Sequence, residues 1–520
     1  MANIQCAEEF FMANEALRHF RPTQASIPPR EVNYRLRLPS GVPVHIHALN
    51  PLAFLLRAAQ VYPSKLALVH PDVPHPVIYS YGVWAQRVQN FAYALIQAGV
   101  KPTDRIAIIA PNTPAVAEAY HGVLGARAVI CAINTRLTHG EVAYILEHSE
   151  SKLVFVDHEY THLVKGAKVP VVVINDNGRE DDPYEQFLTS GRKFSGERGW
   201  PGLEWERNED APCALNYTSG TTGRSRCVSG YEALSAFFRE LRMGLQIGLI
   251  NAPQARRLER PVRAIIAGSA PTAHLIGELE KINIVPIHVY GLTCTYGPST
   301  KCYYQPHWMS LSLEERAKLL ARQGHSFATA EDARVVFQLK EGEIPDAPLV
   351  DVPKDGKTMG EIVFRGNIVM KEYFKDPEAT CKAFRGGYFN TGDLAVWHPD
   401  GYIAVQDRSK DIIISGGENA SSLAIEQELA THPDVLEVSV VARPHPKWGE
   451  RPMAFVILHP QKAAKWKGRH AEFEQDLKKH VRGRLPGFAC PEWVSVVDEL
   501  PKTSTGKIQK VELRKLVAKL

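Results

Sequence analysis

The sequence lacks long apolar runs and a strong excess of either charge. No stretch of 18 apolar residues occurs in the 520 residues, which argues against a membrane-spanning helix. Lysine and arginine number 61 and aspartate and glutamate 57, and a net charge of +4 gives little support for nucleic-acid binding. Glycine (37) and proline (36) are too few for a disordered or collagen-like chain. We therefore expect a globular protein with no nucleic-acid partner and no membrane span.

Paired cysteines are also missing. The eight cysteines are scattered, and no two of them have the C-x-x-C spacing of zinc or redox motifs. The first thirty residues lack the apolar core of a secretory signal, so a disulfide framework is not expected. The cysteines are interpreted as small buried side chains in a reducing compartment.

The first part of the sequence alternates short apolar strands with amphipathic helices. The predicted strands are 105–110, 129–133, 152–157 and 169–175, and the predicted helices are 51–62, 82–98 and two that begin at Pro114 and after Thr138. This order predicts a parallel sheet with helices on both faces, whose ligands bind beyond the carboxyl ends of the strands. Residues 176–210 are polar and contain several glycines, which predicts a long surface connection.

The remaining sequence predicts two smaller units. Residues 353–407 are rich in glycine, valine and isoleucine and predict a β-rich subdomain. After Arg408 the pattern is α+β, with helices near 421–431 and 471–484 and strands near 436–441 and 452–458. We therefore predict an α/β chain with a large N-terminal domain, 1–409, of parallel and mixed sheets plus this subdomain, and a small α+β C-terminal domain, 410–520.

The strongest local motif is a loop of serine, threonine and glycine that follows a strand-like run. It has the sequence YTSGTTG over residues 217–223, and Arg224 and Arg226 follow closely. Glycines allow successive backbone N–H groups to converge, and hydroxyl groups around them can surround phosphate oxygens. The spacing differs from that of a Walker A loop, and the same composition is also typical of a flexible turn.

Four other positions each have a functional and an ordinary interpretation. Tyr290 ends an apolar strand and can stack on a flat heterocycle or belong to the core. Asp393 is expected on a turn after a strand, where its carboxylate can accept the hydroxyls of a ribose or stabilise the turn. Arg408 lies in a charged cluster, and Lys507 lies on a Ser/Thr/Gly-rich tip from which it can reach an oxyanion or remain in solvent.

Together, the order, spacing and type of these motifs resemble the adenylate-forming superfamily of acyl-CoA synthetases, luciferases and nonribosomal adenylation domains. The resemblance covers nearly the whole chain, including 99–104, 134–136 and 448–450, and is densest over 360–426. There GEIVFRGNIVM, YFNTGDL, HPDGYI and DRSKDIIISGGEN resemble short- and medium-chain acyl-CoA ligases. The resemblance implies an ATP-dependent acid–thiol ligase that converts a carboxylic acid, expected to be a fatty acid, to acyl-AMP and then to acyl-CoA, with ATP, coenzyme A and Mg²⁺.

The resemblance also implies a role for each matching residue. Lys507 would bridge the carboxylate and the α-phosphate during adenylation, Lys410 would be the hinge of a mobile C-terminal domain, and Gly416 and Gly417 would lie near coenzyme A. The residues that would bind ATP or AMP are Thr218, Ser219, Gly220, Thr221, Thr222, Gly223, Arg226, Ser269, Ala270, His288, Val289, Tyr290, Gly291, Leu292, Thr293, Asp393 and Arg408.

Two departures from the family pattern leave alternatives open. Cys294 stands where the family has a glutamate that helps to bind Mg²⁺, and no metal ligand is identified in its place. The segment between Gly223 and Gly268 is several tens of residues shorter than in relatives, around 226–254, where they build the acyl-pocket wall. The alternatives are a degenerate or mis-spliced member with weak or no catalysis, or a free-standing adenylation enzyme that serves a carrier protein. A missing wall should also expose apolar surface and lower solubility.

The sequence ends in Ala518-Lys519-Leu520, which resembles the Ser-Lys-Leu peroxisomal signal. A helix that happens to end in these residues is the ordinary interpretation. The predicted partners are a small-molecule carboxylic acid and the peroxisomal import receptor, and the predicted location is the peroxisome, with the cytoplasm as the alternative.

Overall fold

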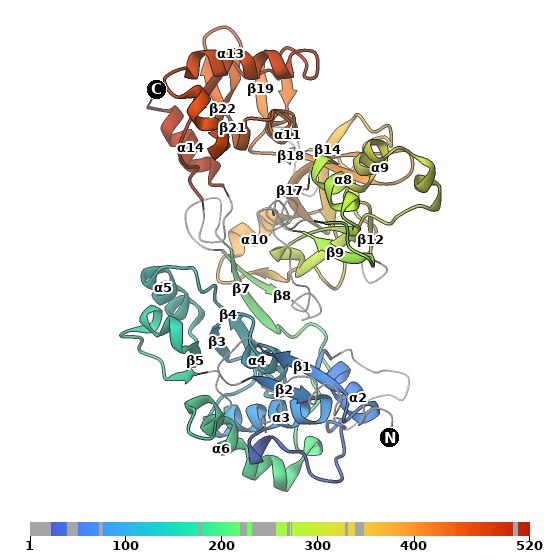
Figure 1. Ribbon diagram of the computed structural model, residues 1–520. Coiled ribbons are helices and arrows are strands. Elements are labelled where there is room, and N and C mark those ends of the chain that lie inside the picture. Colours follow the sequence, from blue (N-terminus) through green and yellow to red (C-terminus); the bar gives the residue numbers. More distant parts are fainter. Residues whose placement is uncertain are drawn as a thin grey trace. The chain divides into compact units, whose positions relative to one another are not determined.

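The computed structural model describes residues 22–38, 50–71, 76–175, 179–218, 226–230, 256–267, 271, 273–327, 331–338, 348–502 and 508–519. The described residues divide into two compact units (Figure 1). One contains the residues up to 218 together with 226–230 and 370–375, and the other contains 256–369 and 376–519.

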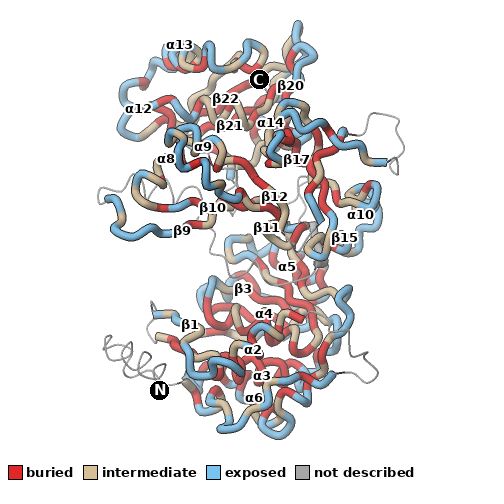
Figure 2. The backbone as a smooth tube through the Cα atoms, turned by 90° about the vertical axis from the view of Figure 1, so that its right-hand side faces the viewer, coloured by how far each residue is buried: buried red, intermediate tan, exposed pale blue. Residues whose placement is uncertain are grey.

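The first unit is built on a seven-stranded sheet with the order β15-β8-β7-β4-β3-β5-β6. Five of these strands run parallel, which confirms the predicted parallel sheet, and β8 and β15 are antiparallel additions at one edge. The strands are β3 (Arg105–Ile109), β4 (Val129–Ala132), β5 (Leu153–Asp157), β6 (Val171–Ile174), β7 (Ala214–Thr218), β8 (Arg226–Gly230) and β15 (Glu372–Tyr373). Figure 2 shows that β3 is largely buried, as expected for a strand covered on both faces.

Helices and a hairpin complete this unit. The helices are α2 (Leu52–Val61), α3 (Tyr81–Gln97), α4 (Pro114–Gly125), α5 (His139–Ser149) and α6 (Pro183–Arg198), and the hairpin consists of β1 (Leu66–His70) and β2 (Val77–Ser80). Short 3-10 turns lie at η2 (Gln24–Ser26), η3 (His158–Val164) and η4 (Trp200–Gly202). The predicted capping box is present at the start of α5, where Thr138 accepts a hydrogen bond from the Glu141 backbone N–H.

The prediction of a long surface connection over 176–210 was wrong, because α6 occupies much of it. Asp182 caps the helix and Pro183 is its first residue, which is a favourable start. Gly191 within α6 allows close packing on α3, since a Cβ there would lie 2.0 Å from the carbonyl oxygen of Asn90. Gly191, one of the glycines that indicated a loop, therefore belongs to a helix–helix contact.

The second unit begins with a four-stranded sheet of the order β12-β11-β10-β9. Its strands are β9 (Val262–Ile266), β10 (Ile284–Leu292), β11 (Gly297–Lys301) and β12 (His325–Ser326), with helices α8 (Ala273–Lys281) and α9 (Leu313–Leu320) and the turns η6 (Thr293–Thr295) and η7 (Pro306–Ser310). A five-stranded antiparallel sheet follows, which confirms the β-rich subdomain. Its elements are β13 (Arg334–Val336), β14 (Met359–Phe364), α10 (Pro377–Ala383), β16 (Phe384–Arg385), β17 (Tyr388–Trp397) and β18 (Ile403–Arg408).

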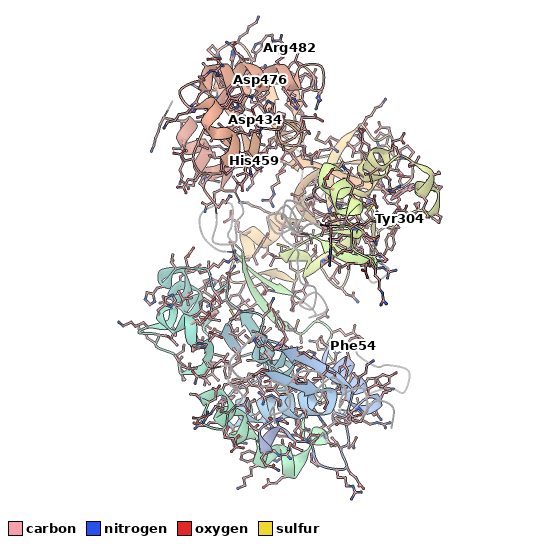
Figure 3. The ribbon with its side chains drawn as sticks, in the orientation of Figure 1. Phe54, Tyr304, Asp434, His459, Asp476 and Arg482 are labelled. Carbon is pink, nitrogen blue, oxygen red and sulfur yellow. The ribbon has the colours of Figure 1, made fainter. Side chains whose placement is uncertain are left out.

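The same unit ends in the predicted α+β pattern. The elements are β19 (Ile413–Ser415), β20 (Glu418–Ala420), α11 (Ser422–Leu429), β21 (Val435–His445), β22 (Gly449–Leu458), α12 (Pro460–Trp466), α13 (His470–Val481), β23 (Trp493–Val496) and α14 (Lys510–Val517). The buried side chains of Phe473, Leu477 and Val481 form one face of α13 within the core. Asp434, which Figure 3 labels, accepts a hydrogen bond from the Trp466 indole at 2.8 Å and so fixes α12.

The cysteine prediction was correct only in part. Cys131 and Cys302 are buried. Cys381 is exposed and lies on α10, a helix without buried residues. Within the ranges that the structure describes, no helix is long and apolar enough to cross a membrane.

Candidate active site

A tyrosine, an aspartate and an arginine predicted from separate motifs meet in the second unit. The Tyr290 hydroxyl on β10 donates a hydrogen bond to Asp393 Oδ2 on β17 at 2.7 Å. Arg408 at the end of β18 lies directly opposite Asp393 in the strand ladder, and its Nε is 3.5 Å from Asp393 Oδ1. Burial, and then the nearby Asp393 carboxylate, raise the pKa of Tyr290 well above its usual range, so the phenol remains a donor. We call these three residues the Asp393 cluster.

Of the two charged members of the Asp393 cluster, Arg408 is the more exposed to solvent. The Asp393 side chain is 8% exposed, whereas that of Arg408 is 35% exposed. The Tyr290 ring packs 6.2 Å from the Phe364 ring, against the core of the β-rich subdomain. The cluster therefore combines a fixed carboxylate with an accessible cation, and a carboxylate of this kind can accept hydrogen bonds from a sugar diol.

Asp393 does not lie on a turn after a strand, as the sequence predicted, but inside the continuous strand β17. The stretch from Thr391 to Asp393 is an irregularity in the strand, because Gly392 has a φ of +73° and the pairing with β14 shifts register beside it. Glu361 on β14 holds this irregular stretch by accepting the Gly392 N–H at 2.9 Å. Turn-forming residues indicated a turn, but strands on both sides keep the segment in the sheet.

Glu361 is a supporting residue that the motif analysis missed. Burial raises the pKa of its carboxyl group, although the Gly392 N–H opposes this shift. Its only signal in the sequence is an acidic residue within an apolar strand, GEIVF.

His288 and Val289 of β10 lie inside the unit. The His288 side chain is 3% exposed, and Val289 is 5% exposed. Burial lowers the pKa of His288 to about 4, and its buried Nδ1 has no hydrogen-bond partner among the described residues. Gly291 lies against the β11 backbone, where a Cβ would be 1.9 Å from the Gly297 carbonyl oxygen. The last two predicted residues of this motif are Leu292, which ends β10, and Thr293, which begins η6.

The predicted hinge and coenzyme A positions lie near the start of the C-terminal part. Lys410 is exposed, and its carbonyl oxygen accepts a hydrogen bond from Arg514 at 3.1 Å. Gly416 and Gly417 form the exposed turn between β19 and β20, with φ values of +64° and +89°. Glycine tolerates these left-handed conformations without strain.

Several predicted residues lie outside the described ranges. These are Ser219, Gly220, Thr221, Thr222, Gly223, Ser269, Ala270 and Lys507. Thr218 and Arg226 are described as backbone only, at the end of β7 and the start of β8, where they form the last pair of an antiparallel ladder. The phosphate-binding and adenylation roles of these residues remain predictions.

The residues around Cys294 do not fit a magnesium site. Cys294 lies in η6, and a thiol is a poor ligand for a hard cation. Among the residues with described positions, no group of three or more histidine, cysteine, aspartate or glutamate side chains is arranged to hold a metal ion.

Two family profiles match the sequence. One, described as "AMP-binding enzyme", matches residues 55–229, and the other, described as "AMP-binding enzyme C-terminal domain", matches residues 424–507. Solved structures support the fold. The chain matches an anthranilate CoA ligase in complex with anthranoyl-AMP with a TM-score of 0.69, at 20% identity over 92% of this chain and 99% of that one. An o-succinylbenzoate CoA synthetase from Bacillus subtilis, bound to its acyl-adenylate intermediate, matches with a TM-score of 0.68, at 20% identity over 90% and 99% of the two chains.

Curated plant enzymes match at higher identity. A peroxisomal trans-cinnamate:CoA ligase of Petunia hybrida is 33% identical over 90% of this chain and 94% of its own length. A peroxisomal acetate/butyrate–CoA ligase of Arabidopsis thaliana is 35% identical over 91% and 95%. An acetate–CoA ligase of Humulus lupulus is 36% identical over 90% and 94%.

One alignment contains many positions without a residue of this chain, and where the predicted shortening around 226–254 falls in it stays a prediction. The alignment with the Petunia enzyme is 560 positions long and includes 90% of this chain. Nine-tenths of 520 residues is 468, so roughly 90 of the aligned positions are gaps in this chain. The first profile match ends at residue 229, just after the Ser/Thr/Gly loop. Despite this gap, identity above 30% over nine-tenths of the sequence shows that the chain belongs to the AMP-binding enzyme family, among its acid–CoA ligases.

Proposed function

We propose that this chain is an AMP-forming ligase that joins a small carboxylic acid to coenzyme A through an acyl-AMP. The observation that carries the proposal is the identity of 33–36% to plant CoA ligases over nine-tenths of the chain. The Asp393 cluster supports it, because a fixed carboxylate beside an accessible guanidinium suits the sugar of a nucleotide.

The proposed reaction has two balanced steps. The acid's carboxylate oxygen attacks the α-phosphorus of ATP, the bond to the bridging oxygen breaks, and pyrophosphate leaves with its electron pair. The thiol of coenzyme A then attacks the acyl carbon and gives up its proton, and AMP leaves. In this scheme Asp393 would orient the ribose, and Lys507 would stabilise the charge that develops at the α-phosphate.

The proposed substrate is a short- or medium-chain fatty acid, which places the enzyme in fatty-acid metabolism. Two of the matching enzymes act on acetate or butyrate, as their names state. Others are named for trans-cinnamate and benzoate, so aryl acids are the competing class. ATP and coenzyme A are the proposed co-substrates.

We also propose that the chain has two domains, residues 1–409 and 410–520.

The first experiment is AMP release by the purified chain with Mg-ATP, coenzyme A and a series of acids from acetate to octanoate, with benzoate and cinnamate alongside. AMP release that requires both an acid and coenzyme A is expected. Release that needs the acid but not coenzyme A would favour the adenylation enzyme that serves a carrier protein. Folded chain that releases no AMP with any acid would contradict the ligase proposal.

A second candidate is a family member with weak or no catalysis. Cys294 and the roughly 90 alignment positions without a residue favour it. Cys294→Glu separates the two defects. A large gain in AMP release would mean that the missing carboxylate was limiting, whereas unchanged absence of activity would assign the defect to the shortened segment.

We further propose import into the peroxisome through the C-terminal tripeptide. Helix α14 ends at Val517, so Ala518 and Lys519 follow the helix, and Lys519 is exposed. Four of the matching enzymes carry the word peroxisomal in their names. An N-terminally tagged chain should appear in peroxisomes, and deletion of Leu520 should return it to the cytoplasm. Diffuse fluorescence that the deletion does not change would contradict the proposal.

A further inference from the structure

Three residues in or next to one turn (Trp448, Glu450 and Arg451) hold three consecutive residues in or next to another (Ile414, Ser415 and Gly416). The first turn joins β21 to β22, and the second is the exposed glycine turn after β19. The Trp448 carbonyl oxygen accepts the Gly416 N–H at 2.8 Å, and the Glu450 carboxylate accepts the Ile414 N–H at 2.9 Å. Between them, Arg451 Nη1 donates to the Ser415 hydroxyl at 3.1 Å.

Arg451 connects this arrangement to a third segment. Its Nη1 donates to the carbonyl oxygens of Gly487 and Phe488 at 3.2 and 3.0 Å, and its Nη2 donates to those of Gly487 and Cys490, both at 3.2 Å. Its Nε lies 3.3 Å from the Glu492 carboxylate. The planar guanidinium therefore uses all its nitrogens at once, a geometry that lysine cannot reproduce.

The position of Arg451 contrasts with that of the turn that it supports. The Arg451 side chain is 12% exposed, and Ser415 is 2% exposed. Residues 416–419 in front of them are all exposed. An exposed turn in a left-handed conformation, with its support buried behind it, is a fixed surface rather than a free loop.

We propose that Arg451 is a positioning residue for the second half-reaction, because it holds the Gly416–Gly417 turn at a fixed position. The inference rests on the proposed function and on the role that the family resemblance implies for this turn, next to coenzyme A. Arg451 itself touches neither substrate nor the reacting atoms. Its loss should therefore weaken the use of coenzyme A and leave the formation of acyl-AMP unchanged.

The test compares Arg451→Lys and Arg451→Met with Arg443→Met. Arg443 is the matched control, because it lies directly opposite Arg451 on the β21–β22 ladder but contacts the Trp493 ring, 4.4 Å away. Acid-dependent exchange of pyrophosphate into ATP measures adenylation, and AMP release at increasing coenzyme A concentration measures the second step. For Arg451→Met we expect the KM for coenzyme A to rise about tenfold, a smaller rise for Arg451→Lys, and exchange within about twofold of the wild type.

Parallel loss of exchange and AMP release, or no change in either, would overturn the inference. If Arg451→Met does not fold, Ser415→Ala removes the acceptor on β19 without touching residues 487–490, and should raise the same KM to a smaller extent. If the wild type shows no acid-dependent exchange, the proposed function fails, and calorimetric titration with coenzyme A decides the inference separately. About tenfold weaker binding by Arg451→Met supports it, whereas equal affinity, or no binding by the wild type, contradicts it.

Discussion

Two clusters of charged side chains, one in each unit, differ in what completes them. In the first unit, Arg87 lies 2.6 Å from both Glu118 and Glu185, and all three side chains are at most 3% exposed. In the second unit, Asp393 has Arg408 at 3.5 Å, and the Arg408 side chain is 35% exposed. The first cluster is closed by protein groups, whereas the second presents a cation to solvent.

Protein groups surround the first cluster on every side. The Tyr184 hydroxyl donates to Glu118 at 2.8 Å, Arg87 donates to the Ser26 hydroxyl at 2.8 Å, and the Tyr79 ring lies 4.6 Å from the guanidinium. Because a buried charge without its partner is costly, this cluster should contribute to stability. We therefore expect the closed cluster to stabilise the fold, and we propose that the open cluster binds a ligand.

The largest effect is expected when the closed cluster loses its cation. Arg87→Met leaves two carboxylates buried together and should lower the free energy of unfolding of the first unit by about 3–5 kcal/mol. Chemical denaturation followed by circular dichroism measures it. Arg179→Met is the matched control, since its partner Asp181 and Arg179 itself are both mostly exposed, and it should change stability by less than about 1 kcal/mol. A loss of less than about 1 kcal/mol for Arg87→Met would refute a stabilising role for the closed cluster.

The second effect concerns His288, which the sequence placed at the nucleotide but which the structure buries. Its pKa is about 4 in the folded chain and 6.5 when free, so the unfolded chain binds the extra proton first. Stability should be complete above pH 6.5 and should fall as the pH drops toward 4, by up to about 3 kcal/mol. His288→Gln should flatten this part of the pH profile without changing the KM for ATP. An unchanged pH profile in His288→Gln would contradict the assignment of this loss of stability to His288.

Sequence patterns could predict the elements, but not the packing that selects among interpretations. The strand–helix alternation correctly predicted the parallel sheet, and three separate motifs contributed to the Asp393 cluster. The helix over Pro183–Arg198 was missed because Gly191 indicates a break unless its contact with Asn90 is known. The Arg87 cluster was missed because its members come from three helices, α3, α4 and α6, and no spacing along the chain relates them.

The third effect tests the open cluster. Asp393→Asn keeps the shape of the side chain and an acceptor for Tyr290, but it loses the charge. We expect kcat/KM for ATP to fall by about 10- to 100-fold, as for hydrogen bonds to a charged group, with little change in thermal midpoint. Asp355→Asn, an exposed aspartate in the same unit, is the control. A large drop in the thermal midpoint of Asp393→Asn with unchanged kinetics would mean that this cluster stabilises the fold and does not bind ATP.

The smallest effect is expected at Tyr290. Tyr290→Phe keeps the ring against Phe364 and removes the hydroxyl that donates to Asp393, so kcat/KM for ATP should fall about three- to tenfold. Steady-state kinetics measure it, with Tyr388→Phe on β17 as a control, because that hydroxyl donates a long, exposed hydrogen bond to Glu331 at 3.4 Å and does not contact Asp393. Equal effects of the two substitutions would mean that the phenol does not hold Asp393 for a ligand.

The most direct test of the central claim, that the Asp393 cluster binds the nucleotide, is calorimetric titration with ATP in the absence of acid and coenzyme A. Wild-type chain and Asp393→Asn would be measured side by side, with Asp355→Asn as the matched control. The account predicts that the wild type and Asp355→Asn bind ATP equally and that Asp393→Asn binds it about 10- to 100-fold more weakly. Equal affinity in all three, or no binding by folded wild-type chain, would contradict it.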